Sequence, residues 1–466
     1  MPTFVPDTLA TWTAGRWTAR PGAPLTGFSF DTRTLRAGDV FVALQTEKRD
    51  GHDFLADAQA AGATAAMVSR EVGSSPLPQL VVADPLTAFQ AVAREHRRTF
   101  RGPVVGISGS AGKTSTKDLL AVLLGGAASG VVATEGNLNN HLGVPLTLTR
   151  IDPARTTAAV IEAGISAPGE MEPLAAMIAP DVSIITLVAP AHTEALGGIE
   201  GVAREKARLP AATRPGGIAL FTRQAAEFAP FRDLRVPTLV LERAGSLHSV
   251  PGAGQRVPFS VSHQGEETRL ALAFGPPPAR EFRLRRVSDG MAENAALALT
   301  AALRLGVSRD DLQMRLADWK PARMRGEIRR IDGRVLYLDC YNANPASMAD
   351  ALAAFVALVP AGEPRMFVIG CMEELGEGAP GYHRALGRSL PLGPGDLLFV
   401  IGTQAHEVCS GALEQGDVTQ QIQMVSTLAP VVTALAAWRG AVFVKGSRRY
   451  QLERIFEGGA SHSLPC

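Results

Sequence analysis

A glycine-rich segment carries the chemistry that the sequence shows most plainly. The segment Gly106-Ile-Ser-Gly109-Ser-Ala-Gly112-Lys113-Thr114-Ser115 lies between a short apolar stretch and a stretch with helical periodicity. Closely spaced glycines allow a tight turn that points several backbone N–H groups at a phosphate. Lys113 can reach the β- and γ-phosphates, and the hydroxyl of Thr114 or Ser115 can bind Mg²⁺. The general pattern G-x-x-x-x-G-K-[ST] fails by one position, because residue 107 is Ile. We therefore predict a nucleoside triphosphate site, with hydrolase, kinase and ligase chemistry all still open.

Three polar residues farther along the chain could complete such a site. Glu162 directly follows the apolar stretch 158–161, and a carboxylate at a strand end beside a phosphate loop suits Mg²⁺. His192 follows the next apolar stretch, and Lys206 lies 14 residues beyond it. A solvated Glu, a structural His and a surface Lys are the ordinary alternatives. Only six of the 46 Lys and Arg residues are lysines, so a lysine at position 206 is more informative than usual.

Alternating apolar strands and amphipathic helices must position these residues. Their order predicts an α/β fold of three domains: a smaller N-terminal α/β domain (1–100), a central P-loop-type doubly wound sheet (101–322) and a C-terminal Rossmann-like sheet (323–466). Short apolar runs predict strands at 39–44, 65–69, 104–107, 158–161, 182–187, 218–221, 335–339, 366–369, 397–401 and 441–444. Helical periodicity predicts helices at 53–61, 114–124, 292–305, 347–358 and 427–438. Residues 225–285 are rich in Val, Pro and Gly and predict an antiparallel appendage.

Composition and charge argue against several classes of function. The net charge is +1 and the sequence has no basic patch, so we expect no nucleic acid partner. The uncharged apolar stretch between Asp118 and Glu135 has 16 residues, fewer than the roughly 20 that a membrane span needs. No secretory signal is recognisable, and Cys340, Cys371, Cys409 and Cys466 lack C-x-x-C spacing. We therefore expect free thiols and a cytoplasmic location.

Residues 109–115 also match G-[TS]-x-G-K-[TS]-[TS], the loop of the Mur ligase family. This family comprises the ATP-dependent, amide-forming enzymes of peptidoglycan precursor synthesis. Over nearly its whole length the sequence resembles the members that use D-alanyl-D-alanine. Four further stretches carry the resemblance: Asp31-Thr32-Arg33 with 38–44 and 50–54, the Asn-rich segment 134–147, the segment D-C-Y-N-A-N-P-A-S-M at 339–348, and V-K-G-S-R at 444–448.

The resemblance implies a reaction and its cofactors. ATP phosphorylates the terminal carboxylate of UDP-N-acetylmuramoyl-tripeptide (UDP-MurNAc-tripeptide), and the amine of D-alanyl-D-alanine (D-Ala-D-Ala) attacks the acyl phosphate. Two Mg²⁺ ions are implied, one held by Thr114 and Glu162 and the other by His192 and a carbamylated Lys206. The implied catalytic residues are Lys113, His192 and Lys206. The family also suggests a monomer.

The same resemblance assigns binding residues in all three domains. The implied ATP contacts are Gly109, Ser110, Ala111, Gly112, Lys113, Thr114, Ser115, Asn294, Asp339 and Arg323, with Arg325 as the alternative alignment for the last. The implied substrate contacts are Asp31, Thr32, Arg33, Asn137, Asn139, Asn140, Tyr341, Asn342, Asn344 and Ser347. We expect the N-terminal domain to hold the UDP end, and the 341–347 segment to approach D-Ala-D-Ala. The alternative for the latter segment is a strand-to-helix turn with an Asn cap.

Several positions depart from the family pattern. Leu187 and Met291 stand where the family often has Asn, and Cys371 stands where it has an acid. We expect Cys371 to be a small buried residue at a strand end. Three alternatives to the main hypothesis stay open: a divergent relative with another substrate, a ligase of the folate-polyglutamate or cyanophycin type, and a nucleotide-dependent binding protein without catalysis.

Overall fold

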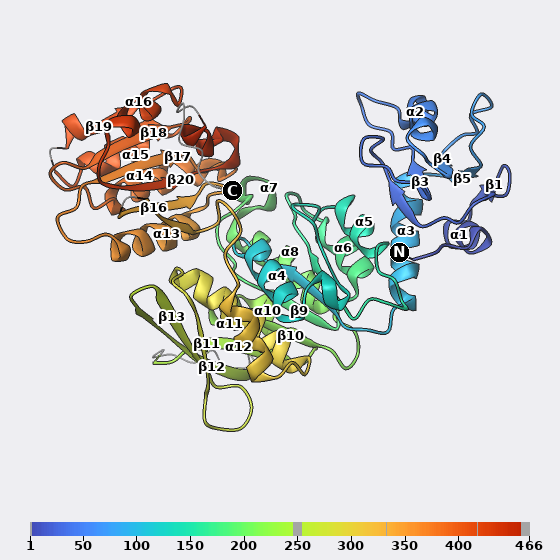
Figure 1. Ribbon diagram of the computed structural model, residues 1–466, viewed down its shortest axis with the longest axis horizontal. Helices are drawn as coiled ribbons and strands as arrows, with labels where there is room; N and C mark the ends of the chain where they lie inside the picture. The colour runs from blue at the N-terminus through green and yellow to red at the C-terminus, as the bar shows by residue number, and fades with distance from the viewer. Residues whose placement is uncertain (1, 246–253, 332, 417, 458–466) are drawn as a thin grey trace.

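Three β-sheets, one after another along the chain, organise the molecule (Figure 1). The computed structural model describes residues 2–245, 254–331, 333–416 and 418–457. The sheets have five, nine and six strands, and the N-terminal and C-terminal units lie on opposite sides of the central one. This arrangement confirms the predicted α/β fold, with a central doubly wound sheet, a Rossmann-like C-terminal sheet and a smaller N-terminal α/β unit.

The N-terminal sheet has the strand order β1-β5-β4-β3-β2. The strand β1 is antiparallel to β5, and the other neighbours are parallel. The elements are α1 (Pro6–Thr13), β1 (Arg16–Trp17), β2 (Gly27–Ser29), β3 (Asp39–Val42), α2 (Leu55–Ala60), β4 (Ala65–Val68), β5 (Gln79–Val81) and α3 (Pro85–Thr99).

Helix α3 ties the N-terminal unit to the central one. It packs against α5 (Gly143–Leu148) and α6 (Met171–Ile178) of the central unit. Near the end of α3, the fully buried guanidinium of Arg97 donates hydrogen bonds to the carbonyls of Ile178 and Ala179 and to the carboxylate of Asp181. A buried charge held by this many partners fixes the helix where the two units meet.

The central sheet has the order β14-β13-β12-β11-β10-β9-β6-β8-β7. Its strands from β7 to β12 are mutually parallel. The strands are β6 (Val104–Ser108), β7 (Val131–Ala133), β8 (Ala158–Glu162), β9 (Val182–Ile185), β10 (Ile218–Thr222), β11 (Thr238–Arg243), β12 (Gln255–Gln264), β13 (Glu267–Leu272) and β14 (Arg280–Arg285). The remaining helices are α4 (Lys113–Leu123), α7 (Thr193–Leu196), α8 (Gly198–Ala211), α9 (Arg223–Ala226), α10 (Ala229–Arg232), α11 (Asp289–Arg304) and α12 (Arg309–Ala317).

The predicted appendage at 225–285 is antiparallel in part, but it is not separate from the central sheet. The first half of β12 pairs in parallel with β11, and from Phe259 onward the strand pairs with β13 in the antiparallel sense. One long strand thus belongs to both arrangements, and the hairpin extends the same sheet. Residues 246–253 of this stretch lie outside the described residues.

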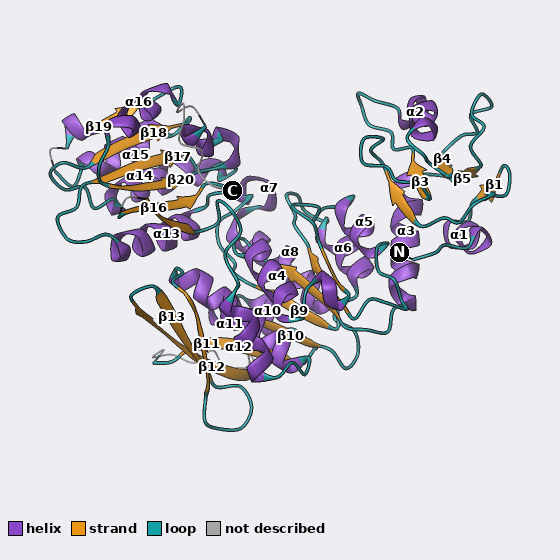
Figure 2. Ribbon diagram, viewed as in Figure 1, coloured by secondary structure: helices purple, strands orange, loops and turns teal. Residues whose placement is uncertain are grey.

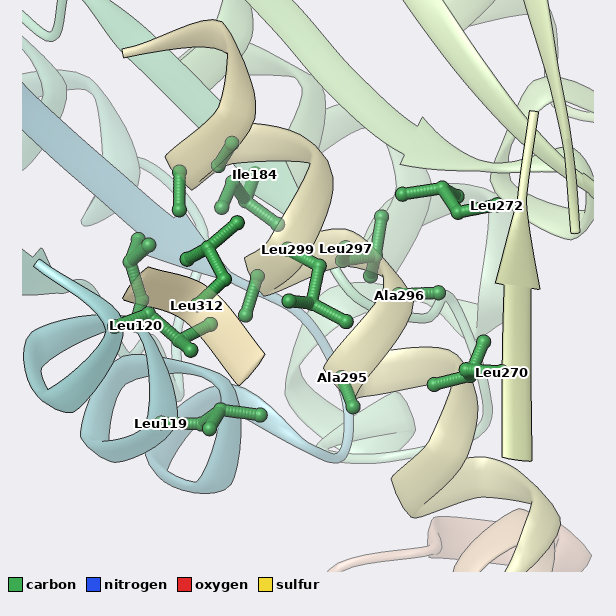
Figure 3. Packing of buried hydrophobic residues seen from close by; sticks show 14 of the residues in the cluster. Leu119, Leu120, Ile184, Leu270, Leu272, Ala295, Ala296, Leu297, Leu299 and Leu312 are labelled. Carbon is green, nitrogen blue, oxygen red and sulfur yellow. The ribbon is translucent and has the colours of Figure 1, made fainter. Parts of the chain in front are cut away.

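Helices cover both faces of the central sheet (Figure 2). In β6, Val105 packs with α4, α11 and α12, whereas Val104 packs on the other face with α6 and α8. Strands buried on both faces read as uninterrupted apolar runs, which is the pattern that the sequence shows. Figure 3 shows the first of these layers, where Leu120 of α4, Leu299 of α11 and Leu312 of α12 meet.

The C-terminal sheet has the order β15-β16-β20-β17-β18-β19, with only β15 antiparallel to its neighbour. Its strands confirm the four predicted ones and add two at the edges. The elements are β15 (Glu327–Ile331), β16 (Arg334–Asp339), α13 (Pro345–Leu358), β17 (Arg365–Gly370), α14 (Ala379–Ser389), β18 (Leu397–Ile401), α15 (Ala405–Leu413), β19 (Ile422–Met424), α16 (Ala429–Ala437) and β20 (Ala441–Lys445).

The cysteines and the helices bear on two further expectations. Cys340, Cys371 and Cys409 are free and buried, and Cys466 lies outside the described residues. Within the described part of the chain, no helix combines the length and the apolar character needed to cross a bilayer.

Candidate active site

A cavity of about 240 Å³ lies between the central and C-terminal units. The central unit lines it with the phosphate loop, the end of β8 and the start of α11. The C-terminal unit lines it with the ends of β16 and β20 and the start of α13. Both sheets therefore face the cavity with the carboxyl ends of their strands, the edge at which such folds bind ligands. A larger groove of about 630 Å³ lies along α8, and it contains none of the predicted site residues.

The predicted phosphate loop joins β6 to α4 and forms one wall of the cavity. Gly112 has a left-handed φ of 78°, and a side chain there would lie 2.5 Å from the amide of Asn294. Glycine at this position therefore lets the loop pass close to α11. The Lys113 ammonium donates a hydrogen bond to the carbonyl of Gly109 at 2.8 Å. Burial lowers the pKa of Lys113. The negative charge of Glu162 opposes this shift, and the positive charge of Arg325 adds to it.

Glu162 stands at the end of β8, next to the loop strand β6, and is 1% exposed. One of its carboxylate oxygens accepts a hydrogen bond from Asn139 Nδ2 at 2.7 Å. Its other oxygen, Oε2, is buried and has no hydrogen-bond partner. A buried orphan carboxylate oxygen beside a phosphate loop and the Thr114 hydroxyl fits a Mg²⁺ ion. The described residues contain no group of three or more His, Cys, Asp and Glu side chains that could hold a metal, and Mg²⁺ needs none because it also takes water and phosphate oxygens.

The structure brings the three predicted catalytic residues together. His192 is the N-cap residue just before α7 and has a left-handed φ of 55°, and its Nδ1 contacts the carboxylate of Glu374 from the C-terminal unit. Burial lowers the pKa of His192, the charges of Lys113 and Lys206 lower it further, and Glu374 opposes them. Neither His192 nor Lys206 is part of the cavity wall, but the charge of Lys113 acts on both of them, so both lie near it.

Lys206 is an unusual lysine. It lies on α8, is 3% exposed, and has no hydrogen-bond or ion-pair partner among the described residues. Burial, and then the charge of Lys113, lower its pKa well below the ordinary value. A buried lysine without an anionic partner favours the neutral amine.

Arg325, and not Arg323, reaches the cavity. Arg323 is exposed, whereas the guanidinium carbon of Arg325 lies 3.9 Å from the centroid of the Tyr341 ring, and both residues of this pair line the cavity. The alternative alignment is therefore the one that fits the geometry. Asn294 and Asp339 line the same cavity, as predicted.

Lys445 is a cavity residue that the sequence prediction did not include. It ends β20, is fully buried, and its ammonium lies 2.5 Å from the Asp339 carboxylate at the end of the neighbouring strand β16. It also donates a hydrogen bond to the carbonyl of Asn342 at 3.3 Å. The scarcity of lysine and its place in the V-K-G-S-R stretch were the signals that could have identified it.

Asn344 and Ser347 form a capping box at the start of α13. The Asn344 side chain accepts a hydrogen bond from the Ser347 N–H at 2.9 Å, and the Ser347 hydroxyl accepts one from the Asn344 N–H at 3.1 Å. These two residues therefore form the strand-to-helix turn with an Asn cap, which is the alternative prediction for this segment. Both also line the cavity with Tyr341 and Asn342.

The remaining predicted substrate residues lie in different places. Asn137 and Asn139 line the cavity, whereas Asn140 does not, and its side chain accepts hydrogen bonds from the N–H groups at the start of α5. The predicted N-terminal residues line no part of this cavity; they are Asp31, Thr32 and Arg33. Arg33 forms an ion pair with Asp31, and this contact lowers the pKa of Asp31 to about 2.

The three departures from the family pattern also have clear positions. Leu187 and Met291 line the cavity beside the phosphate loop and Asn294. Cys371 is fully buried at the end of β17, as expected, and burial raises its pKa to about 12. Its thiol is therefore a neutral packing group.

Comparisons with known proteins agree with this architecture. Family models match residues 107–236 (Mur ligase middle domain), 324–448 (Mur ligase, glutamate ligase domain) and 24–95 (Mur ligase family, catalytic domain). The chain is 30% identical to the UDP-N-acetylmuramoyl-tripeptide–D-alanyl-D-alanine ligase of Bacillus subtilis (strain 168), over 92% of both chains. It superposes on MurF from Acinetobacter baumannii with a TM-score of 0.85 at 26% identity, over 98% of both chains. MurF from Thermotoga maritima in complex with ADP gives 0.75 at 26% identity, covering 93% of this chain and 96% of that one.

Proposed function

Because the chain belongs to the Mur ligase family, we propose that it joins D-Ala-D-Ala to UDP-MurNAc-tripeptide and converts ATP to ADP and phosphate in the same reaction. The Bacillus subtilis relative is a UDP-N-acetylmuramoyl-tripeptide–D-alanyl-D-alanine ligase, and this relationship and the likeness to two MurF structures support this choice of substrates. One structural observation carries the proposal: a single cavity joins the phosphate loop of the central unit to Asp339, Tyr341 and Lys445 of the C-terminal unit. Nucleotide chemistry and amide formation can then occur in one place.

In the first half of the reaction, a carboxylate oxygen of the tripeptide attacks the γ-phosphorus of ATP, and ADP leaves. The reacting groups are anionic on both sides, so this step needs positive charge and orientation more than covalent assistance. The loop amides and Lys113 would bind the phosphates. Arg325 supplies a second cation on the opposite wall, since it acts on the charge of Lys113 across the cavity.

Two metal positions belong to this proposal. Thr114 and Glu162 would hold one Mg²⁺, and the orphan oxygen of Glu162 supports that role. His192 and a modified Lys206 would hold the second. When bound, Mg²⁺ supplies positive charge that neutralises the phosphate oxygens.

The proposed modification of Lys206 is a carbamate. A neutral amine attacks CO₂ and, after losing a proton, becomes an anionic group with two oxygen donors, which are the ligands that Mg²⁺ prefers. Burial and the lowered pKa of Lys206 support the neutral amine that this step requires. Arginine could not replace it, because a guanidinium stays protonated.

In the second half, the amine of D-Ala-D-Ala attacks the acyl carbon, and the tetrahedral intermediate releases phosphate. Hydrolysis of the acyl phosphate competes with this step, so water must be kept out. The contacts of Asn344 with Ser110 and of Glu374 with His192 hold the C-terminal unit over the loop. We further propose that the N-terminal unit binds the UDP end, and that the reaction takes place in the cytoplasm, where ATP and UDP-linked precursors are found.

The test is a substrate-omission assay. Purified protein is incubated with ATP, Mg²⁺, UDP-MurNAc-tripeptide and D-Ala-D-Ala, with diaminopimelate and lysine forms of the tripeptide assayed separately. We expect ADP and phosphate to form in a one-to-one ratio with a UDP-MurNAc-pentapeptide, which is identified by its mass. Little ADP should form when either UDP-MurNAc-tripeptide or D-Ala-D-Ala is omitted. Ligation of glutamate or another amino acid in place of D-Ala-D-Ala would contradict the proposal, and so would ADP formation that ignores both peptides.

A further inference from the structure

The backbone fixes the stack of Arg325 on Tyr341, which distinguishes it from an ordinary surface pair. Arg325 lies in the tight turn that leads into β15, between Met324 and Gly326, and both neighbours have left-handed φ angles of 61° and 66°. The Tyr341 N–H donates a hydrogen bond to the Met324 carbonyl at 3.3 Å, which holds the turn beside the ring. The backbone thus places this one side chain over this one ring.

The guanidinium of Arg325 is otherwise uncommitted. Among the described residues it has no hydrogen-bond or ion-pair partner, although many arginines of the chain pair with carboxylates. A carboxylate partner would occupy its N–H donors and cancel its charge, whereas an aromatic face orients a guanidinium and leaves the donors and the charge free. These free donors belong to a residue that lines the same cavity as Lys113.

We propose that Tyr341 is a positioning residue, and that its ring holds the Arg325 guanidinium ready for the phosphate oxygens. The inference rests on the proposed function, since it takes Arg325 as a group that binds the transferring phosphate. It replaces the sequence-based expectation that Tyr341 contacts D-Ala-D-Ala. The ring is the functional part, and the phenol hydroxyl is not required.

The experiment is a double-mutant cycle with two readouts. Tyr341→Ala should lower kcat about 5- to 30-fold, the range that a partly desolvated cation–π contact covers, with the KM for D-Ala-D-Ala nearly unchanged. Tyr341→Phe should retain activity within about twofold, because it keeps the aromatic face. Arg325→Ala should lose about 100-fold, and adding Tyr341→Ala to it should cost almost nothing more.

Guanidinium ion provides the second readout. Added to Arg325→Ala, it should restore part of the rate, and it should restore much less when Tyr341 is also Ala, because the ring that orients it is gone. Arg454→Ala, which removes an exposed arginine of the same unit outside the cavity, controls for general loss of charge. Thermal unfolding of each variant shows whether it is folded.

Three results would overturn the inference: a Tyr341→Phe variant as impaired as Tyr341→Ala, losses that multiply in the double variant, or an effect confined to the KM for D-Ala-D-Ala. The same cycle is also measured on the Kd of a non-hydrolysable ATP analogue with Mg²⁺, which requires no acceptor. If the wild type forms no pentapeptide, the proposed function is wrong. The coupling of Arg325 and Tyr341 in the Kd of the ATP analogue still shows whether Tyr341 positions Arg325.

Discussion

The side chain of Asn344 in the C-terminal unit donates a hydrogen bond from Nδ2 to the carbonyl of Ser110 in the phosphate loop, at 3.2 Å. The same side chain caps α13 through its Oδ1 atom. One residue therefore both begins a helix of one unit and touches the nucleotide loop of another. This contact couples the position of the C-terminal unit to the phosphate site.

The two ends of the Asn344 side chain are separable by mutation. Asn344→Ala should lower the free energy of unfolding by about 1 kcal/mol, because the cap is lost. Asn344→Asp should keep the cap and the stability, because a carboxylate also accepts the Ser347 N–H. It should nevertheless raise the KM for ATP about five- to tenfold, since the donor to Ser110 is lost and a negative charge faces the phosphates. Denaturant unfolding and initial rates measure the two effects.

Ser308 provides the matched control for this pair of variants. It caps α12 by accepting a hydrogen bond from the Asp311 N–H at 3.1 Å, and it does not line the cavity. Ser308→Ala should cost a similar stability and leave the KM for ATP unchanged. If Asn344→Asp also left that KM unchanged, the contact with Ser110 would have no part in nucleotide binding.

The parts of the site that the sequence predicts are those that depend on local structure. The loop around Gly112 and Lys113 needs only a strand, a tight turn and a helix, and Glu162 needs only to end the adjacent strand. The role of Arg325 could be assigned only from the three-dimensional structure, because its position depends on how the turn before β15 packs against Tyr341. The position of Glu374 likewise follows from contact between two units, which no local pattern encodes.

The fold shows the same division. The apolar runs of the parallel strands identify them directly, because they are buried on both faces. The continuity of β12 with both β11 and β13 could not be predicted, because the pattern of one strand does not say how many neighbours it pairs with along its length.

Lys113→Ala should reduce ligation by about 100-fold or more, because it removes a cation that neutralises developing phosphate charge. The protein should remain folded, since the ammonium bonds only a loop carbonyl and burial already disfavours its charge. Lys320→Ala, at an exposed position outside the cavity, is the control. Turnover near the wild-type value in Lys113→Ala would remove the loop from the catalytic account.

Lys206 offers a test that distinguishes a charge from a ligand. Lys206→Ala should be nearly inactive, and Lys206→Arg should be no better although it keeps a positive charge. Short carboxylic acids added to Lys206→Ala should restore part of the rate by supplying oxygen donors. Rates are measured with and without added bicarbonate and acetate. Full activity of Lys206→Arg would contradict the carbamate.

Glu293 predicts a dependence of stability on pH. It lines the cavity beside Asn294, and burial raises its pKa to about 7, with Asp350 and Asp289 adding to the effect and Arg243 opposing it. An acid with a raised native pKa stabilises the protein fully below its unfolded pKa, and this contribution is lost as the pH rises from there through about 7. Glu293→Gln should therefore raise Tm relative to the wild type at pH 8, and much less at pH 5. An equal difference at both pH values would show that the carboxyl does not titrate in this range.

We expect the tripeptide carboxylate to be activated as an acyl phosphate in the cavity between the central and C-terminal units. UDP-MurNAc-tripeptide labelled with ¹⁸O in its terminal carboxylate tests for this intermediate, because the oxygen that attacks the γ-phosphorus leaves with the phosphate. In the presence of D-Ala-D-Ala, mass spectrometry should show that the released inorganic phosphate carries one ¹⁸O atom for each pentapeptide formed. Phosphate without the label, or pentapeptide formed together with AMP and pyrophosphate, would contradict it.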